Sequence, residues 1–383
     1  MWPEVFPSWV ARYWKGSSGR FATSDVSASV LYNKCQITAA PSSAGSMTLD
    51  DRYSRQILFT PIGEAGQRRL AAASVAIVGC GATGSATAAL LARAGVGHLR
   101  IIDRDYVERS NLQRQPLFDE ADALESLPKA IAAQRKLAQL NSAIAIEARV
   151  DDLIPGNAGE LLRNSELILD GTDNFETRYV LNDYAVSSSI PWIYAAAVGS
   201  YCATMNILPG ETACLACLFP QPPEAAETCD TAGILNSAAH LASALQSAEA
   251  IKLLVGAKEN LRRSLLSFDV WKNEQAEVAA GSQRAACRTC GQRDFLHLSG
   301  AARPQITLCG RNSVQIHKRG DVLSFAEVSQ RLTPHGRVKH NEFVLKFWRE
   351  PYELTLFPDG RAIIKGTTDT AVARNLYARF IGS

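Results

Sequence analysis

The stretch from Ser74 to Asp103 reads SVAIVGCGATGSATAALLARAGVGHLRIID, and it indicates the fold of the chain. It opens with the apolar run Val75–Val78, which is typical of a strand buried on both faces. The segment Ser85–Ala94 is rich in Ala and Leu, which favour helix, and the apolar run Leu99–Ile102 follows it. The stretch therefore predicts a strand, a turn, a helix and a second parallel strand that ends in an acidic residue.

Three glycines in the predicted turn, Gly79, Gly81 and Gly84, have the spacing G-x-G-x-x-G. Glycines let the backbone turn tightly and approach a phosphate, and the start of the next helix offers free N–H groups to an anion. Asp103 is placed to bind a ribose hydroxyl. We therefore expect a nucleotide site, with a tight structural turn in another kind of parallel sheet as the alternative. The motif alone does not identify the nucleotide.

Length and composition restrict the class of protein. The 383 residues suggest two or three domains, and 46% hydrophobic and 20% charged residues are ordinary for a soluble globular protein. The net charge of +2 gives no indication of nucleic acid or a membrane surface as a partner, and no apolar run reaches the ~20 residues that span a bilayer. Four of the nine cysteines form C-x-x-C pairs, which fits a metal site in the reducing cytoplasm better than a secreted disulfide scaffold.

Changes in composition divide the chain into three parts. Residues 1–46 are rich in Ser, Ala and Pro and lack periodicity, so we expect a disordered extension. Residues 47–298 contain the nucleotide motif. Residues 299–383 predict a small α+β module, with a hairpin turn at Pro358-Asp359-Gly360 and a closing helix at 371–380. The module contains no cluster of His, Cys or paired acids that would indicate chemistry of its own.

Polar residues follow two of the predicted strands at the edge where open α/β sheets bind ligands. After Asp103, residues 105–115 read as a polar loop with little core character, in which Arg114 is able to hold a phosphate, or simply faces solvent. Lys129, at the start of the next helix, is also able to reach phosphate oxygens. Asp173 follows the buried run 167–170 and suits Mg²⁺ on nucleotide phosphates, or else it caps the helix at 176–187.

Cysteine spacing predicts a metal site. Cys214 and Cys217 form one C-x-x-C pair, and Cys287 and Cys290 form a second after 69 intervening residues. Four thiolates suit a closed, structural Zn²⁺ site; the alternatives are reduced surface pairs or one redox-active pair. Cys229 lies in a polar loop before a long predicted helix, a position that can lower the pKa of a thiol and make it nucleophilic, although an inert thiol fits equally.

Taken together, these residues resemble the ThiF/MoeB/HesA family, the bacterial relatives of ubiquitin-activating enzymes. The resemblance covers roughly residues 51–291 and rests on five motifs and one lysine: Arg52-Tyr53-Ser54-Arg55-Gln56, the glycine motif, Ser110-Asn111-Leu112-Gln113-Arg114-Gln115, Lys129, Asp170-Gly171-Thr172-Asp173-Asn174 and the two C-x-x-C pairs. It implies a Rossmann-like, doubly wound, mostly parallel sheet, and a homodimer with structural zinc. The implied activity is ATP- and Mg²⁺-dependent adenylation of the C-terminal glycine of a ubiquitin-like sulfur carrier (ThiS- or MoaD-like) in thiamine or molybdopterin-type cofactor biosynthesis.

The resemblance also implies residue roles. Asp103 would bind the ATP ribose, the glycines would line the nucleotide, and Asp173 would hold Mg²⁺. The phosphates would be held by Arg114 and Lys129, with the site ordered by Asn111 and Gln115. Arg55, which periodicity places with Arg52 on a solvated helical face, would instead reach into the site of the partner subunit. Cys229 matches the thiol that in some members forms a link to the carrier.

Two further expectations concern partners and alternatives. No rhodanese domain is recognisable in the C-terminal module, so sulfur would come from a separate sulfurtransferase or cysteine desulfurase. A catalytically silent nucleotide-binding scaffold of the same fold is the alternative function, and a nicotinamide oxidoreductase is a more distant one.

Overall fold

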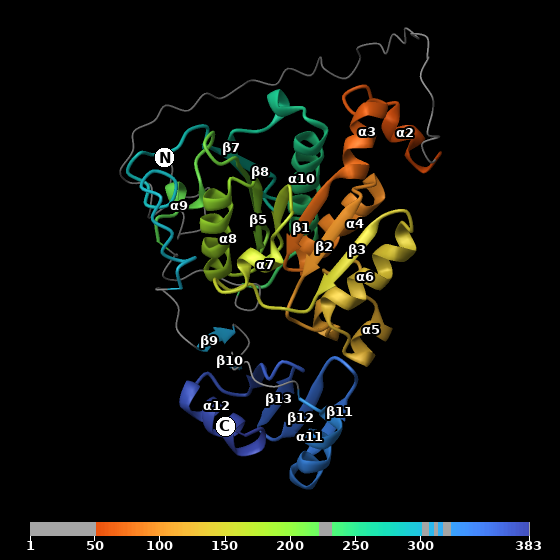
Figure 1. The fold of residues 1–383 in the computed structure, drawn as a ribbon, viewed down its shortest axis with the longest axis vertical. Coiled ribbons are helices and arrows are strands. Elements are labelled where there is room, and N and C mark those ends of the chain that lie inside the picture. The colour runs from red at the N-terminus through yellow and green to blue at the C-terminus, as the bar shows by residue number, and fades with distance from the viewer. Residues whose placement is uncertain (1–50, 222–231, 301–305, 310–312, 317–322, 383) are drawn as a thin grey trace.

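The computed structural model describes residues 51–221, 232–300, 306–309, 313–316 and 323–382. Figure 1 shows two units in this part of the chain: an α/β domain above and a smaller C-terminal module below. This arrangement confirms the expected α/β domain with an α+β module. The expected extension 1–46 and the candidate thiol Cys229 lie outside the described residues.

The larger domain is built on one mixed sheet of eight strands, in the order β3-β2-β1-β4-β5-β6-β7-β8. Its first five strands in this order are parallel: β3 (Ala145–Arg149), β2 (His98–Ile102), β1 (Ser74–Val78), β4 (Leu167–Asp170) and β5 (Trp192–Val198). The last three pair antiparallel: β6 (Tyr201–Ile207), β7 (Ser264–Asp269) and β8 (Glu274–Ala279). The parallel order 3-2-1-4-5 is that of a Rossmann-like sheet, as expected.

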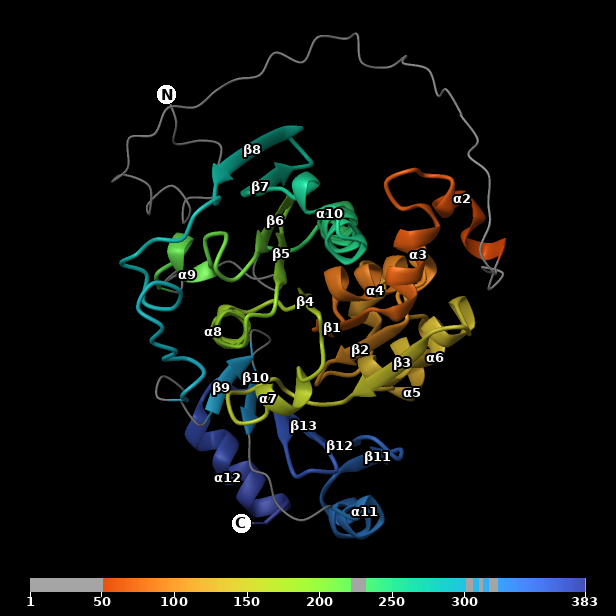
Figure 2. The ribbon, with the colours of Figure 1, turned by 45° about the horizontal axis from the view of Figure 1, so that its top comes forward.

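Helices cover both faces of this sheet, because its central strands are apolar on both sides. Figure 2 shows the two layers. One face is covered by α3 (Gly63–Ala72), α4 (Ala82–Ala94), α6 (Lys129–Leu140) and α10 (Asn236–Val255). The other is covered by α7 (Ala158–Leu161), α8 (Phe175–Ser188) and α9 (Leu215–Leu218). Of the helices in the described residues, none combines the length and the apolarity that crossing a bilayer requires.

The C-terminal module is a six-stranded antiparallel sheet with two helices on one face. Its strand order is β11 (Arg337–His340), β12 (Leu345–Arg349), β13 (Tyr352–Leu356), β14 (Ala362–Lys365), β10 (Ser313–Ile316) and β9 (Ile306–Cys309). The helices α11 (Phe325–Leu332) and α12 (Thr370–Phe380) bury side chains such as Phe347 and Leu354. The predicted hairpin joins β13 to β14.

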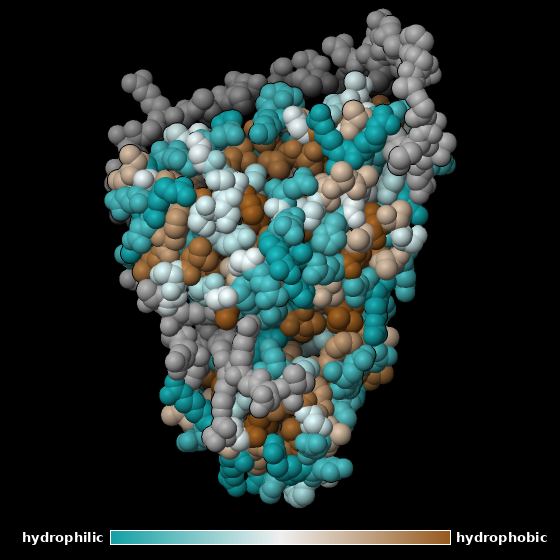
Figure 3. Space-filling model, in the orientation of Figure 1, coloured by the Kyte–Doolittle hydropathy of each residue, from teal (hydrophilic) through white to brown (hydrophobic). Residues whose placement is uncertain are grey.

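The two ends of the parallel strands face different neighbours. The first described elements are a 3-10 turn, η1 (Asp51–Tyr53), and one helical turn, α2 (Ser54–Ile57), in place of the single helix expected there. Gln56 donates to the carbonyl of Ala94, at the C-terminal end of α4, so α2 lies beside the amino ends of the strands. The C-terminal module lies beneath their carboxyl ends (Figure 1). It forms the narrow lower part of Figure 3, whose face shows hydrophobic patches scattered among hydrophilic residues.

Candidate functional site

The glycine turn packs directly against the loop that follows β4. Gly79 has φ +86°, and a Cβ at Gly84 would lie 1.9 Å from the carbonyl oxygen of Gly79. A Cβ at Gly171 would lie 2.2 Å from that same oxygen. Gly81 is different, because its nearest neighbour would be the Gly171 carbonyl oxygen at 3.9 Å. Protein packing therefore requires glycine at three of these positions, whereas at Gly81 the open space leaves room for a ligand.

Asp103 closes the turn from the side of β2. One carboxylate oxygen accepts from the backbone N–H of Cys80 at 2.6 Å and the other from that of Asp105 at 2.7 Å. The residue is 8% exposed; burial raises the pKa of Asp103, and the charge of Lys129 only partly opposes this. Each carboxylate oxygen can accept a second hydrogen bond, so the side chain can still bind a ribose hydroxyl.

Lys129 brings a buried positive charge to the same edge of the sheet. Its ammonium lies 3.0 Å from a carboxylate oxygen of Asp105, and its side chain is 6% exposed. Its backbone N–H also donates to the carbonyl of Asp105 at 2.8 Å. Because one contact fixes the backbone and the other the side chain, the start of α6 is tied to the loop that follows Asp103.

Two buried amide side chains in this loop have unused hydrogen-bonding atoms. Asn111 ends the short helix η2 (Arg109–Asn111), and Gln115 lies four residues later. Within the described residues, Nδ2 of Asn111 and Oε1 of Gln115 have no hydrogen-bond partner, although both residues are at most 3% exposed. Nε2 of Gln115 would lie 4.0 Å from a Cβ on Gly81. An unsatisfied buried polar atom costs about 1–3 kcal/mol, so the side chain of Gln115 fits a polar ligand beside Gly81, and Asn111 offers a second unused group in the same loop.

Arg114 and Asp173 lie at the outer side of this edge. The half-buried Arg114 folds back and donates to the carbonyl of Ser110 at 2.7 Å. Asp173 is exposed, and the N-cap of α8 is Asn174, whose side chain accepts from the N–H of Thr177. The alternative that Asp173 caps this helix is therefore wrong, and its carboxylate is left for another role.

An internal ion pair that the sequence reasoning missed holds the loop after β4. Arg178 donates to Asp170 at 2.9 Å, and also to the carbonyls of Thr172 and Ala195. The side chains of Arg178 and Asp170 are 6% and 0% exposed. Burial alone would lower the pKa of Arg178, but the nearby Asp170 carboxylate outweighs it and raises that pKa. The pair thereby fixes the loop that carries Asp173.

Arg55 lies away from this cluster. It is an exposed residue of α2, beside the amino ends of the strands, whereas the glycine turn and the loops after β2 and β4 follow their carboxyl ends. The side chain therefore cannot contribute to the candidate site of its own chain.

The four predicted metal ligands do come together. Their Sγ–Sγ distances are 3.9 Å for Cys214–Cys217, 3.6 Å for Cys214–Cys287 and 3.3 Å for Cys217–Cys290. A tetrahedral Zn²⁺ with Zn–S bonds of 2.3 Å would space its sulfurs by about 3.8 Å. The arrangement thus fits zinc, and the four cysteines are the only such cluster in the described residues. His297 instead stacks on Tyr179, with ring centroids 4.6 Å apart.

Two adjacent polar residues of α8 anchor the two cysteine pairs. Oδ1 of Asn182 accepts from the N–H of Leu215, within the first pair. Asp183 accepts from the hydroxyl of Thr289, within the second pair, and from the N–H of His297. Both residues are fully buried. Both anchors were missed from the sequence, because no spacing rule connects Asn182 and Asp183 with the cysteine pairs.

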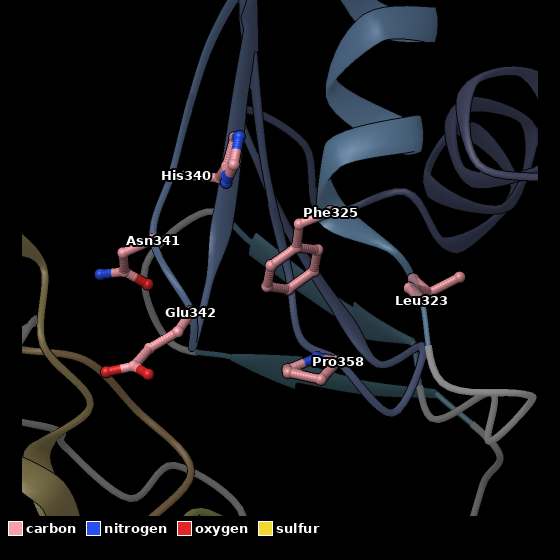
Figure 4. A pocket seen from close by; sticks show the side chains of 6 residues that line it. All are labelled: Leu323, Phe325, His340, Asn341, Glu342 and Pro358. Atoms are coloured by element: carbon pink, nitrogen blue, oxygen red, sulfur yellow. The ribbon is translucent and has the colours of Figure 1, made fainter.

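A separate cavity of about 550 Å³ lies in the C-terminal module (Figure 4). In Figure 4 the side chains of Asn341 and Glu342 point away from Phe325 and Pro358, which lie to their right. Its lining residues all belong to the module: Leu323, Phe325, His340, Asn341, Glu342 and Pro358. The cavity is therefore not formed by any residue of the candidate nucleotide site.

Comparisons with known proteins identify the same family as the sequence motifs do. The sequence profile of the ThiF family matches residues 53–289. The sulfur carrier protein ThiS adenylyltransferase of Bacillus subtilis is 45% identical over 337 residues, covering 86% of this chain and 99% of the relative. The pig adenylyltransferase and sulfurtransferase MOCS3 is 38% identical over 63% of this chain and 53% of its own length. A crystal structure of Escherichia coli MccB with ATP shares the fold, with a TM-score of 0.55 at 24% identity over 63% of this chain and 74% of MccB.

Proposed function

The chain belongs to the ThiF family, and from this premise we propose that it uses ATP to adenylate the C-terminal glycine of a small ubiquitin-like sulfur-carrier protein. The observation that carries the proposal is the match to a ThiS adenylyltransferase over 99% of that relative's length and 86% of this chain, a share too large to leave out the whole C-terminal module. Such a reaction would serve sulfur transfer in thiamine or molybdopterin-type cofactor biosynthesis.

The geometry of the candidate site supports this chemistry. ATP would lie over the glycine turn, with Gly81 facing it, Asp103 on the ribose, and the unused amide atoms of Asn111 and Gln115 bound to it. Lys129 would hold phosphate oxygens in place of its contact with Asp105, and Arg114 would do so by unfolding from Ser110.

Charge stabilisation is the main task of these residues. When the carrier's carboxylate attacks the α-phosphate, negative charge spreads over phosphate oxygens and pyrophosphate, and fixed cations stabilise it. Asp173 would hold a Mg²⁺ ion, which supplies further positive charge at the phosphates. The Asp170–Arg178 pair keeps the Asp173 loop in place before ATP binds.

The proposed enzyme is a homodimer. Because α2 lies beside the opposite ends of the strands, Arg55 would act only in the site of a partner subunit, where it would bind phosphate oxygens. The Cys₄ cluster would hold a structural zinc, since it leaves no open coordination position. A reducing compartment such as the cytoplasm would keep these thiols available to zinc. Sulfur would be delivered by a separate sulfurtransferase or cysteine desulfurase. The Cys229 thiolate would attack the adenylated glycine of the carrier and form a thioester-type link, with AMP as the leaving group.

ATP–pyrophosphate exchange tests the proposal. Exchange should require a carrier ending in Gly-Gly, obtained by affinity capture with this protein and mass spectrometry. Asp173→Ala should abolish exchange and leave zinc content unchanged. If exchange survives this substitution, the metal role of Asp173 is wrong; if the wild type binds ATP but exchanges with no carrier, the silent scaffold is the better description.

Mixed dimers test the role of Arg55. A subunit with Arg55→Ala and a subunit with Asp173→Ala should together recover up to about one intact site per dimer, whereas each variant alone should be inactive. Verified mixed dimers with no activity would contradict a role for Arg55 in the partner's site.

A further inference from the structure

The C-terminal module presents a polar sheet face to the nucleotide domain. The strand registers align Lys339, Lys346, Thr355, Ile363 and Gln315 in one row across the sheet. The neighbouring rows, which point the other way, form the apolar core under α11 and α12. Because the two helices occupy only that apolar face, the row of polar residues is left to meet the larger domain.

Tyr106 is the first residue that this face contacts. It follows β2 by four residues, in the segment expected to be a polar loop with little core character, yet it is 4% exposed. The ammonium of Lys346 lies 3.7 Å from the centroid of its ring, and its hydroxyl lies 3.5 Å from the Thr355 hydroxyl. The expectation of little core character was wrong for Tyr106, because the C-terminal module covers it.

The backbone on both sides of Tyr106 belongs to the candidate nucleotide site. Tyr106 forms an antiparallel bridge with Pro128, just before Lys129. On one side of this bridge Lys129 is bonded to Asp105, and on the other Val107 donates to the carbonyl of Leu127 at 2.8 Å. Any shift of Tyr106 would therefore move the start of α6 together with its buried lysine.

Glu108 provides a second connection, between the module and Asn111. Its carboxylate lies 2.5 Å from the ammonium of Lys365 on β14. Glu108 and Asn111 are also bonded to each other, since the N–H of Asn111 donates to the backbone carbonyl of Glu108 at 2.9 Å and the Asn111 side-chain oxygen accepts from the N–H of Glu108 at 3.3 Å. Burial alone would lower the pKa of Lys365, but Tyr106 and Glu108 outweigh it and raise that pKa. Only Glu108 therefore separates Lys365 from the amide that faces the proposed ATP.

Further contacts join the module to the larger domain. Arg361 donates to the carbonyl of Val150, and Asn341 donates to that of Glu125 at the end of α5 (Glu120–Glu125). Phe343 packs against the hydrophobic core of the nucleotide domain. The module therefore contacts the larger domain at several separate places as well as at the loop after β2.

We propose that the C-terminal module is part of the nucleotide site, in which Lys365 and Lys346 are positioning residues that fix Asn111 and Lys129 through Glu108 and Tyr106. The inference rests on the proposed function only for the identity of the ligand as ATP. Neither lysine touches the nucleotide. Their contribution is to hold the loop after β2 in its binding conformation before ATP arrives. ATP binding then loses less free energy to ordering this loop.

Substitutions that break the ion pair test this role in the full chain. Lys365→Met removes the cation, and Glu108→Gln removes the charge of its partner while leaving the backbone bonds between Glu108 and Asn111 in place. Both should weaken ATP binding, measured without carrier by equilibrium dialysis, by about tenfold, which is the lower end of what the loss of an outer partner costs at metal sites. Lys365→Arg should restore affinity to within about threefold. Arg374→Met, an exposed cation of α12 on the far side of the module, is the matched control and should leave affinity unchanged.

Hydrogen exchange separates positioning from loss of folding. In Lys365→Met, amides in residues 104–116 should exchange faster, whereas those in 352–380 should keep their protection. ATP affinity within twofold of the wild type in both Lys365→Met and Glu108→Gln would overturn the proposal. So would equal loss of protection throughout the module, since that indicates unfolding. Because ATP binding needs no carrier, failure of carrier-dependent exchange in the wild type would instead count against the proposed function.

Discussion

Replacement of Arg178 by alanine should strongly destabilise the nucleotide domain. The substitution removes a 2.9 Å hydrogen bond to Asp170 and leaves that fully buried carboxylate with only the N–H and hydroxyl of Thr172 as donors. Breaking a buried ion pair from one side costs 3–5 kcal/mol, and the two remaining bonds to Asp170 favour the lower end, about 3 kcal/mol. For a domain of this size that lowers the Tm by roughly 6–12 °C.

A double variant tests whether the unpaired buried charge is the cause of the lost stability. Asp170→Asn with Arg178→Gln replaces the charges by neutral amides, so no unpaired charge stays buried. In differential scanning calorimetry the double variant should recover at least half of the stability lost by Arg178→Ala. Pyrophosphate exchange should stay low, because the shorter Gln side chain no longer holds the Thr172 carbonyl in the loop before Asp173. A loss of less than 2 °C in Arg178→Ala, or a double variant no more stable than it, would refute the argument.

Two other predictions follow from geometry. Elemental analysis of the purified protein should find one zinc per chain. Cys287→Ser should lose this zinc, whereas Cys202→Ser, which changes a buried cysteine outside the cluster, should retain it. Zinc retained in Cys287→Ser would contradict the Cys₄ assignment. Gly84→Ala should prevent normal folding, because its Cβ would lie 1.9 Å from a carbonyl oxygen. Gly81→Ala should fold with an unchanged Tm in calorimetry but bind ATP at least tenfold more weakly in equilibrium dialysis. Unchanged ATP affinity in Gly81→Ala would place the ligand elsewhere.

Local patterns in the sequence were enough to predict most of the nucleotide domain. The apolar runs of β1, β2 and β4 and the glycine motif are contiguous, so their strands and turn are visible without tertiary context. The strands β7 and β8 were not predicted. β8 lies at the edge of the sheet and alternates between half-buried and exposed residues, with little apolar content to mark it.

Relations between distant residues were beyond the sequence reasoning. The role of Asp170 depends on Arg178 turning back beneath the loop, and that of Tyr106 depends on a module more than 200 residues later. The cysteine pairs were predicted because metal ligands follow a spacing rule. No such rule exists for their anchors Asn182 and Asp183. Each binds a loop that comes close only in the folded chain.

The distance in sequence between the two cysteine pairs has a consequence for how the protein matures. Between Cys217 and Cys287 the chain forms α10 and adds β7 and β8 to the sheet, so all four thiolates meet only after those elements are in place. Domains emerge from the ribosome amino end first, and a single pair is an incomplete zinc site. Stable metal uptake should therefore be a late event in biosynthesis, and the bound zinc would mark chains whose sheet is already complete.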